Sequence, residues 1–173
     1  MRPIQIIGAA SGLGAQDHGC ADGPDALRAA GLPARLQAAG LDAHWQETLR
    51  PLAAPDPTQT ITELCTRLSQ SVYHSVESGN FPLVIGGDHS CAIGTWSGLH
   101  RALNLQPIGL IWIDAHMDSH TPQTSPSGAL HGMPLACLLG HGLPVLTGLG
   151  GPPPQLLPQH VCLIGVRSFE AGE

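Results

Sequence analysis

The sequence has 173 residues, and its seven basic and thirteen acidic side chains give a formal net charge of −6 when the ten histidines are neutral. This acidic balance argues against nucleic acid or an anionic membrane surface as the main partner. Charged residues make up only 12% of the chain and hydrophobic residues 42%, so disorder along the whole length is excluded and a sizeable core can be buried. The length fits a single domain over residues 1–173.

Cysteine usage and hydropathy indicate the cellular compartment. The five cysteines are spread along the chain without short paired spacings, which argues against a disulfide framework or a thiolate zinc site. The N-terminal apolar run is too short for a signal peptide, and no stretch approaches the roughly 18 apolar residues that cross a bilayer. We therefore expect a soluble protein in a reducing cytoplasm.

Hydrophobic periodicity predicts strands that alternate with helices. In chain order we predict a strand over 4–8, helices over 23–30 and 33–39, a weaker strand over 42–48, a helix that Thr58 caps and Gly79 ends, a strand over 81–87, a helix over 92–103, a strand over 108–114, a helix over 133–139 and a strand over 161–166. A proline-rich linker over 51–57 and irregular loops over 119–128 and 148–154 separate some of them.

The continuous apolar runs 81–87 and 108–114 are typical of strands that are buried on both faces of a parallel sheet. Strands separated by helices predict βαβ units. The predicted fold class is therefore α/β, with three layers and a mostly parallel sheet that has helices on both faces.

Histidines and aspartates follow two of these strands. Gly86-Gly87-Asp88-His89-Ser90 ends one strand, and Asp114-Ala115-His116-Met117-Asp118 ends the next. Ligands of such sheets bind beyond the carboxyl ends of the strands, and alternate positions of an extended segment point to one side. A lone histidine there is more often an ordinary hydrogen-bonded residue. Two buried carboxylates are costly without a cation, however, and oxygen and nitrogen ligands without thiolate suit manganese, iron or zinc.

These two motifs, followed by Thr121–Leu135 with its Ser-Pro-Ser-Gly and His-Gly-Met-Pro segments, resemble the ureohydrolase superfamily and, within it, the arginase family. The resemblance extends from the first strand to the last residue. It implies an α/β fold, a centre of two Mn²⁺ ions, and hydrolysis of arginine to ornithine and urea by a hydroxide that bridges the metals. It also implies a small guanidino substrate as the partner and a trimer or hexamer as the assembly.

The resemblance assigns metal ligands residue by residue. It implies that His89 and Asp118 bind one manganese, that His116 binds the other, and that Asp114 bridges the two. Asp88 would then be a supporting or structural residue.

Further residues match the substrate-binding and proton-transfer positions of the family. His131 matches the histidine that shuttles protons, with an ordinary loop histidine as the alternative. Ser125 and Ser127 would donate hydroxyl hydrogens to the substrate carboxylate, although serines in such a loop also satisfy turn backbone. Glu170 and Glu173 are candidates for contacts to the α-amino group, although surface glutamates are the commoner case.

The loop departs from the arginase pattern at two positions. His120 and Ala129 stand where arginases commonly carry asparagine. His120 can still donate a hydrogen bond to a substrate carboxylate. Agmatine or another guanidino acid therefore stays open as the substrate.

The largest departure is the absence from this sequence of the family's third motif, which supplies two more aspartate ligands. Four side chains cannot fill two sites that each prefer about five or six ligands unless water supplies the rest. We therefore expect the N-terminal portion of a longer protein, hence an incomplete domain, with weak or no manganese binding and no appreciable activity on its own.

Two other functions compete with that of a ureohydrolase. One is a non-catalytic remnant that binds a ligand or a full-length partner through an open sheet edge. The other is a single-zinc deacylase, which does not explain the Gly-Gly-Asp-His-Ser motif together with the later segments.

Overall fold

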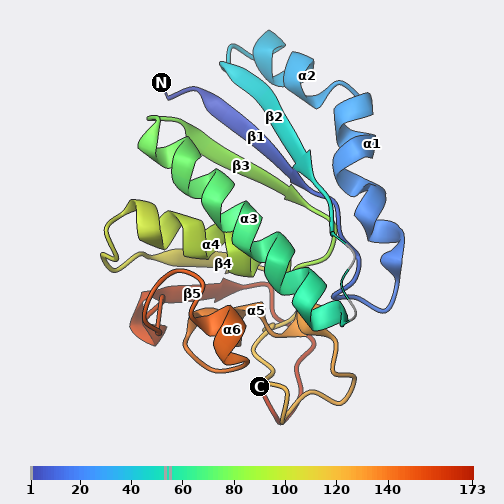
Figure 1. Cartoon of the computed structure of the whole chain (residues 1–173), viewed down its shortest axis with the longest axis vertical. Helices are drawn as coiled ribbons and strands as arrows, with labels where there is room; N and C mark the ends of the chain where they lie inside the picture. The colour runs from blue at the N-terminus through green and yellow to red at the C-terminus, as the bar shows by residue number, and fades with distance from the viewer. Residues whose placement is uncertain (1, 53, 55) are drawn as a thin grey trace.

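The computed structural model of the chain describes residues 2–52, 54 and 56–173 (Figure 1). The strands are β1 (Ile4–Ala9), β2 (Ala43–Leu49), β3 (Phe81–Gly86), β4 (Leu110–Ile113) and β5 (Val161–Ile164). The α-helices are α1 (Gly23–Ala29), α2 (Leu32–Ala38), α3 (Pro57–Glu77), α4 (Cys91–Ala102), α5 (Pro134–Leu138) and α6 (Pro144–Thr147). Short 3₁₀ helices span His18–Asp22, Leu130–Gly132 and Pro158–His160. Each predicted strand and helix is confirmed, with ends shifted by a few residues, and α6 was not predicted.

The strands form two parallel sheets. In the first, β1 lies between β2 and β3, with Ile4 opposite Ala43 and Phe81. In the second, β4 pairs with β5, and Leu110 lies opposite Val161. Because both β3 and β4 are followed by the histidine and aspartate motifs, the sheets bring those motifs to their carboxyl ends.

Helices cover both faces of the first sheet, which confirms the predicted α/β layering. α1 and α3 each contact β1, β2 and β3, and they lie on opposite sides of the sheet, with α2 beside α1 (Figure 1). On the inner face of α3, Leu64, Leu68 and Val72 recur at helical spacing and pack against Ile7 and Leu49 of the sheet. This cluster anchors the long helix.

α4 packs against α3 through two glycines. A Cβ atom added at Gly94 would lie 2.5 Å from the carbonyl oxygen of Cys65, and one at Gly98 would lie 2.4 Å from that of Ser69. The two backbones therefore approach more closely than any side chain allows. This contact sets the position of α4, which begins just after the motif that contains His89.

β3 and β4 are more exposed than the sequence predicts. Phe81 is exposed at the start of β3 and the rest of that strand is half-buried. On β4, Leu110 and Trp112 are buried, but Ile111 and Ile113 are 66% and 76% exposed. The prediction that both strands are buried on both faces is therefore wrong.

The reason for this exposure lies in how the sheets are covered. α4 and α5 pack on one face of β4, where Ala92, Leu135 and Leu138 contact its buried residues. Within the described part of the chain, no helix covers the opposite face. β3 and β4 also belong to separate sheets, so their facing edges are not paired with each other.

The start of α3 also differs from expectation. Asp56, not Thr58, caps the helix, because its carboxylate accepts the backbone N–H of Thr58 at 3.2 Å. Pro57 then occupies the first helical position, where no N–H is needed.

Residues 53 and 55 of the predicted linker lie outside the described residues. The loops over 119–128 and 148–154 contain no regular helix or strand, as predicted.

Within the described part of the chain, no helix combines the length and the apolar character needed to span a bilayer.

Candidate metal centre and adjoining pocket

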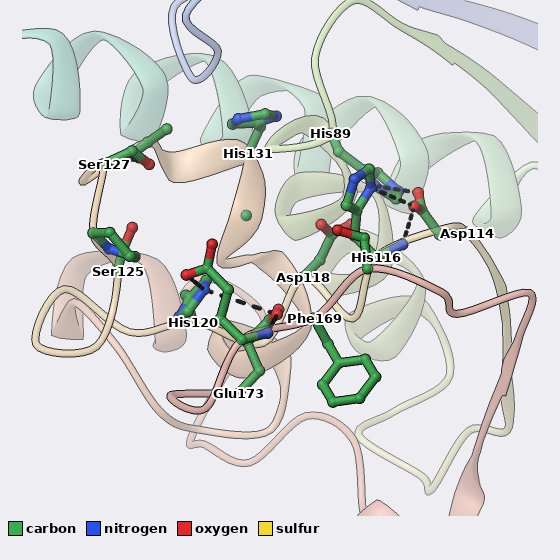
Figure 2. A pocket seen from close by; sticks show the side chains of 15 residues that line it. His89, Asp114, His116, Asp118, His120, Ser125, Ser127, His131, Phe169 and Glu173 are labelled. Atoms are coloured by element: carbon green, nitrogen blue, oxygen red, sulfur yellow. Dashed lines mark hydrogen bonds and ion pairs between the residues drawn. The ribbon is translucent and has the colours of Figure 1, made fainter.

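Three predicted ligands converge at the carboxyl ends of β3 and β4. The Nδ1 atom of His89 lies 2.6 Å from Oδ2 of Asp118 and 3.4 Å from Oδ2 of Asp114. One ligand atom from each of the three lies within 4.8 Å of the other two. Figure 2 shows the three side chains pointing toward one another from two separate loops. We call these three residues the His89–Asp114–Asp118 cluster.

The cluster fits a single divalent cation. Oδ2 of Asp118 is buried and forms no hydrogen bond, and its 2.6 Å contact with Nδ1 of His89 is an ion pair only if the imidazole is protonated. A buried carboxylate oxygen without a partner is costly, and a cation shared with Asp114 and the imidazole would compensate it. Mixed oxygen and nitrogen donors with open positions suit Mn²⁺, Fe²⁺ or Zn²⁺.

A turn, not an extended strand, brings Asp118 to the cluster. β4 ends at Ile113, and the backbone N–H of His116 then donates to Oδ1 of Asp114 at 2.8 Å. Asp118 has a φ of 53°, in the left-handed region that aspartate tolerates better than most residues, and its carbonyl accepts the N–H of Leu135 at 2.9 Å. The expectation of alternating side chains on one extended segment is therefore wrong, although Asp114 and Asp118 still meet.

His116 lies beside the cluster but outside it. Its Nδ1 is 3.0 Å from Oδ1 of Asp114, and its side chain is 61% exposed. Burial raises the pKa of the Asp114 carboxyl, but hydrogen bonds from His116 and the nearby rings of His89 and His116 outweigh this and lower the pKa below its usual value. Asp114 is therefore ionised, and the role of His116 at a second metal stays a prediction.

Asp88 is a structural residue that supports the loop containing His89. Its buried carboxylate accepts the backbone N–H of Gly14 at 3.0 Å and that of Ser90 at 2.9 Å. A Cβ at Gly14 would lie only 2.5 Å from Oδ1 of Asp88, so this approach requires glycine. Asp88 thereby joins the loop after β1 to the loop after β3.

Substitution of Asp88 by alanine tests this support. Two buried backbone N–H groups would lose their acceptor, so we expect the free energy of unfolding to fall by about 2 kcal/mol. Urea denaturation of the purified chain measures it. Asp17→Ala is the control, because Asp17 accepts the N–H of Gly19 at an exposed site. An equal loss in both variants would contradict the role of Asp88.

Trp112 belongs to the site although sequence reasoning treated it only as a strand residue. Its ring stacks on that of His89, with centroids 4.5 Å apart and planes inclined by 22°. Trp112 is buried on β4, so its ring is fixed and supports one face of the imidazole of His89. The sequence contains one indication of this role. Trp112 lies two residues before Asp114, and alternate residues of a strand point to the same side of the sheet.

A cavity of about 310 Å³ adjoins the cluster, and each residue predicted to act at the metal or the substrate lines it. Those residues are His89, Asp114, His116, Asp118, His120, Ser125, Ser127, His131, Glu170 and Glu173. Ser168 and Phe169 also line the cavity and were not predicted, although they lie in the same final segment as the glutamates. The volume is at the lower end of ligand pockets, which run from about 300 to 1,000 Å³.

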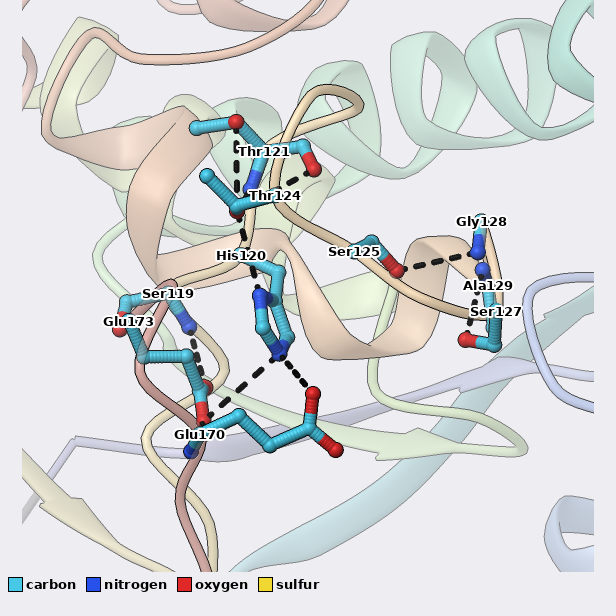
Figure 3. A network of polar contacts seen from close by, with 10 residues as sticks. All are labelled: Ser119, His120, Thr121, Thr124, Ser125, Ser127, Gly128, Ala129, Glu170 and Glu173. Atoms are coloured by element: carbon cyan, nitrogen blue, oxygen red, sulfur yellow. Dashed lines mark hydrogen bonds and ion pairs between the residues drawn. The ribbon is translucent and has the colours of Figure 1, made fainter.

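The loop serines satisfy turn backbone and still face the pocket. Oγ of Ser125 accepts the N–H of Gly128 at 3.0 Å, and Oγ of Ser127 accepts the N–H of Ala129 at 3.2 Å (Figure 3). Because each oxygen acts as an acceptor, each hydroxyl hydrogen is left for a ligand. His131 lies between Ser127 and His89 in the view of Figure 2.

His120 is surrounded by polar groups from two segments. Its Nε2 lies 3.2 Å from Oε2 of Glu170 and 3.8 Å from Oε2 of Glu173, and its Nδ1 lies 3.2 Å from Oγ1 of Thr124 (Figure 3). Glu173 also accepts the backbone N–H of Ser119 at 3.3 Å and that of Glu170 at 3.0 Å. The final segment is thus tied to the loop after β4.

Comparison with known proteins adds independent evidence. A family model described as "Arginase family" matches residues 2–173. An arginase of Bacillus caldovelox is 43% identical over 189 residues, a match that covers 100% of this chain and 60% of that protein. An arginase of Bacillus subtilis is 38% identical, with 99% of this chain and 60% of that protein covered.

Solved structures share the fold. The Bacillus caldovelox arginase superposes with a TM-score of 0.92 over 99% of this chain and 60% of its own. An Entamoeba histolytica arginase in complex with L-ornithine gives 0.89 at 28% identity, over 100% of this chain and 61% of its own. These similarities confirm the α/β fold, and the chain spans about 60% of the length of these relatives.

Proposed function

The chain belongs to the arginase family, and from this membership we propose that its pocket is part of a metal-dependent site that hydrolyses a guanidino compound to urea. The observation that supports the proposal most is the His89–Asp114–Asp118 cluster, in which a buried oxygen of Asp118 forms no hydrogen bond and lies 2.6 Å from the imidazole. Manganese is the metal we propose. Arginine is the substrate that the relatives' names suggest, and agmatine carries the same guanidino group.

The chemistry divides between the cation and the side chains of the pocket. A divalent cation in the cluster would lower the pKa of a bound water and so supply hydroxide near neutral pH. Asp114 and Asp118 would hold the cation, while Trp112 keeps the imidazole of His89 oriented. His131 can deliver a proton to the departing amine as the bond between the guanidinium carbon and that nitrogen breaks.

The described residues supply few ligands for a second cation. The cluster contributes three ligand atoms to one ion, and beside it Asp114 and His116, whose Oδ1 and Nδ1 atoms lie 3.0 Å apart, would supply only two to another. We therefore expect weak binding of about one Mn²⁺ per chain and no appreciable urea release by the chain alone.

The first experiment is manganese titration followed by calorimetric titration with a guanidino ligand. We expect agmatine to release binding heat when Mn²⁺ is present, and n-butylamine, which lacks the guanidino group, to release much less. His89→Ala should remove the manganese dependence, because the variant loses one of three ligands. The matched control is His141→Ala, at an exposed histidine outside the pocket. Equal manganese uptake by both variants, or equal effects of the two ligands, would refute the proposed function.

The cytoplasm remains our proposed location, because the five cysteines are free and suit a reducing compartment. A homo-oligomer remains a proposal from the family resemblance.

A further inference from the structure

The imidazole of His89 lacks the hydrogen bond that usually orients a metal-binding histidine. Within the described part of the chain, its polar contacts are those of Nδ1 with Asp118 at 2.6 Å and with Asp114 at 3.4 Å. A histidine that binds a metal through one ring nitrogen almost always donates the N–H of the other to a carboxylate, a carbonyl or a water. None of the described residues accepts such a bond from Nε2, so another contact must orient this ring.

That contact is the stack on Trp112. The two ring centroids lie 4.5 Å apart and the planes are inclined by 22°, a geometry within the range of attractive aromatic pairs. Elsewhere the imidazole borders open space, because it lines both the pocket and a second cavity of about 560 Å³ whose wall includes Val84, Trp96 and Ile113. Among the described residues, the indole is therefore the rigid surface against which the ring of His89 rests.

The hydrophobic core fixes the indole in turn. Trp112 is only 4% exposed, and it belongs to a buried cluster with Ala92 of α4 and with Leu135 and Leu138 of α5. Side chains in close-packed cores occupy well-defined rotamers, and a change of rotamer requires their neighbours to move. The core that covers β4 thereby determines the plane of the His89 ring.

A role in core packing alone does not explain a tryptophan at this position. Its Nε1 atom is buried and forms no hydrogen bond with any described residue, whereas a buried indole N–H usually has a partner. Phenylalanine or leucine would fill an apolar site without the cost of that unpaired N–H. The wide indole face is what these smaller side chains lack, and that face contacts His89.

From these contacts we propose that Trp112 is a positioning residue of the metal site. Its core-anchored indole directs Nδ1 of His89 toward Asp114 and Asp118, in place of the hydrogen bond that serves this purpose at other metal-binding histidines. The inference rests on the proposed function, because it requires a cation at the cluster. It adds that the affinity for this cation depends on a side chain that does not contact it.

Manganese titrations of three variants test the proposal, with free Mn²⁺ measured by electron paramagnetic resonance and folding checked by urea denaturation. Trp112→Met keeps an apolar side chain that adapts to the core but has no flat face, and we expect its affinity for Mn²⁺ to fall at least about tenfold. Trp112→Phe should restore most of the affinity, because a phenyl ring can still stack on His89. Trp45→Met is the matched control on β2, at the edge of the first sheet opposite β3, and it should bind Mn²⁺ like the unmodified chain.

Nuclear magnetic resonance of the unmodified chain with Zn²⁺, which is diamagnetic, gives a second test that does not depend on the folding of a Trp112 variant. A stacked indole shifts the ring protons of His89 upfield, and His89→Ala identifies those signals by their loss. We expect the upfield shift both without metal and with Zn²⁺ bound, because a positioning contact is present before and after the cation binds. Disappearance of the shift on Zn²⁺ binding would show that the ring leaves the indole, and it would overturn the inference.

The remaining outcomes separate the inference from the proposed function. Unchanged Mn²⁺ affinity in a folded Trp112→Met variant would overturn the inference and leave the proposed function intact. Equal losses in Trp112→Met and Trp112→Phe would also overturn it, because the aromatic face would then make no difference. If the unmodified chain takes up neither Mn²⁺ nor Zn²⁺, the proposed function fails, and the inference fails with it.

Discussion

Replacement of Asp118 by asparagine is expected to lower the affinity of the chain for Mn²⁺ at least about 100-fold, because even residues that only support ligands cost about 10- to 100-fold. Without metal, the same change should raise the melting temperature by about 2–4 °C, which corresponds to about 1 kcal/mol for a domain of this size. The variant removes the charge of a carboxylate whose buried Oδ2 forms no hydrogen bond, and this gain is set against the 2.6 Å contact with His89 that the variant weakens. Asparagine also tolerates the left-handed backbone found at this position.

The two effects have opposite signs, which separates a metal site from an ordinary structural carboxylate. Thermal unfolding with and without Mn²⁺ measures both in one series. Asp42→Asn is the control, since Asp42 forms an exposed contact with His44 away from the cluster. If Asp118→Asn destabilises the metal-free chain and leaves the manganese-induced shift unchanged, Asp118 is structural and the metal assignment is wrong.

Replacement of Gly98 by alanine is expected to reduce the free energy of unfolding by about 3 kcal/mol, at the upper end of the usual cost of overpacking. The new Cβ would lie 2.4 Å from the carbonyl oxygen of Ser69 and 2.9 Å from Cβ of Val72, so α3 and α4 must separate. Alanine is intrinsically better than glycine within a helix by about 1 kcal/mol, but that gain is smaller than the steric cost.

Urea denaturation measures the free energy of unfolding of the Gly98→Ala variant, and the Gly109→Ala variant is the control. A Cβ at Gly109 would meet nothing closer than 3.9 Å, so that variant should unfold close to the unmodified chain. Similar unfolding midpoints for the two variants would show that α3 and α4 do not depend on their backbone contact.

Local sequence was sufficient for the strands, for the α-helices other than α6, and for the ten predicted residues that line the pocket. Apolar spacing predicts α3, because Leu64, Leu68 and Val72 recur on one helical face. Short apolar runs predict β1, β3, β4 and β5, whereas the more polar β2 is a weaker prediction. The motifs after 81–87 and 108–114 indicate where chemistry collects, because the carboxyl ends of parallel strands are where loops converge.

Local sequence was insufficient wherever the outcome depends on a partner far along the chain. The apolar runs at β3 and β4 predict fully buried strands. Ile111 and Ile113 are nevertheless exposed, because burial depends on which elements cover a face of the sheet. Alternation suggested that 114, 116 and 118 act together, but the turn that ends with Asp118 depends on its carbonyl contact with α5. His116 contacts Asp114 but lies outside the His89–Asp114–Asp118 cluster.

By itself, then, the sequence determined the α/β class, the arginase family and ten of the residues that line the pocket, because periodicity and short motifs are local properties. Tertiary structure alone decided that His89 meets both aspartates, that Trp112 stacks on its ring, and that His120 faces Glu170. Each of these contacts joins residues from separate loops or strands. Only the packing of the two sheets and the final segment brings such residues within reach of each other.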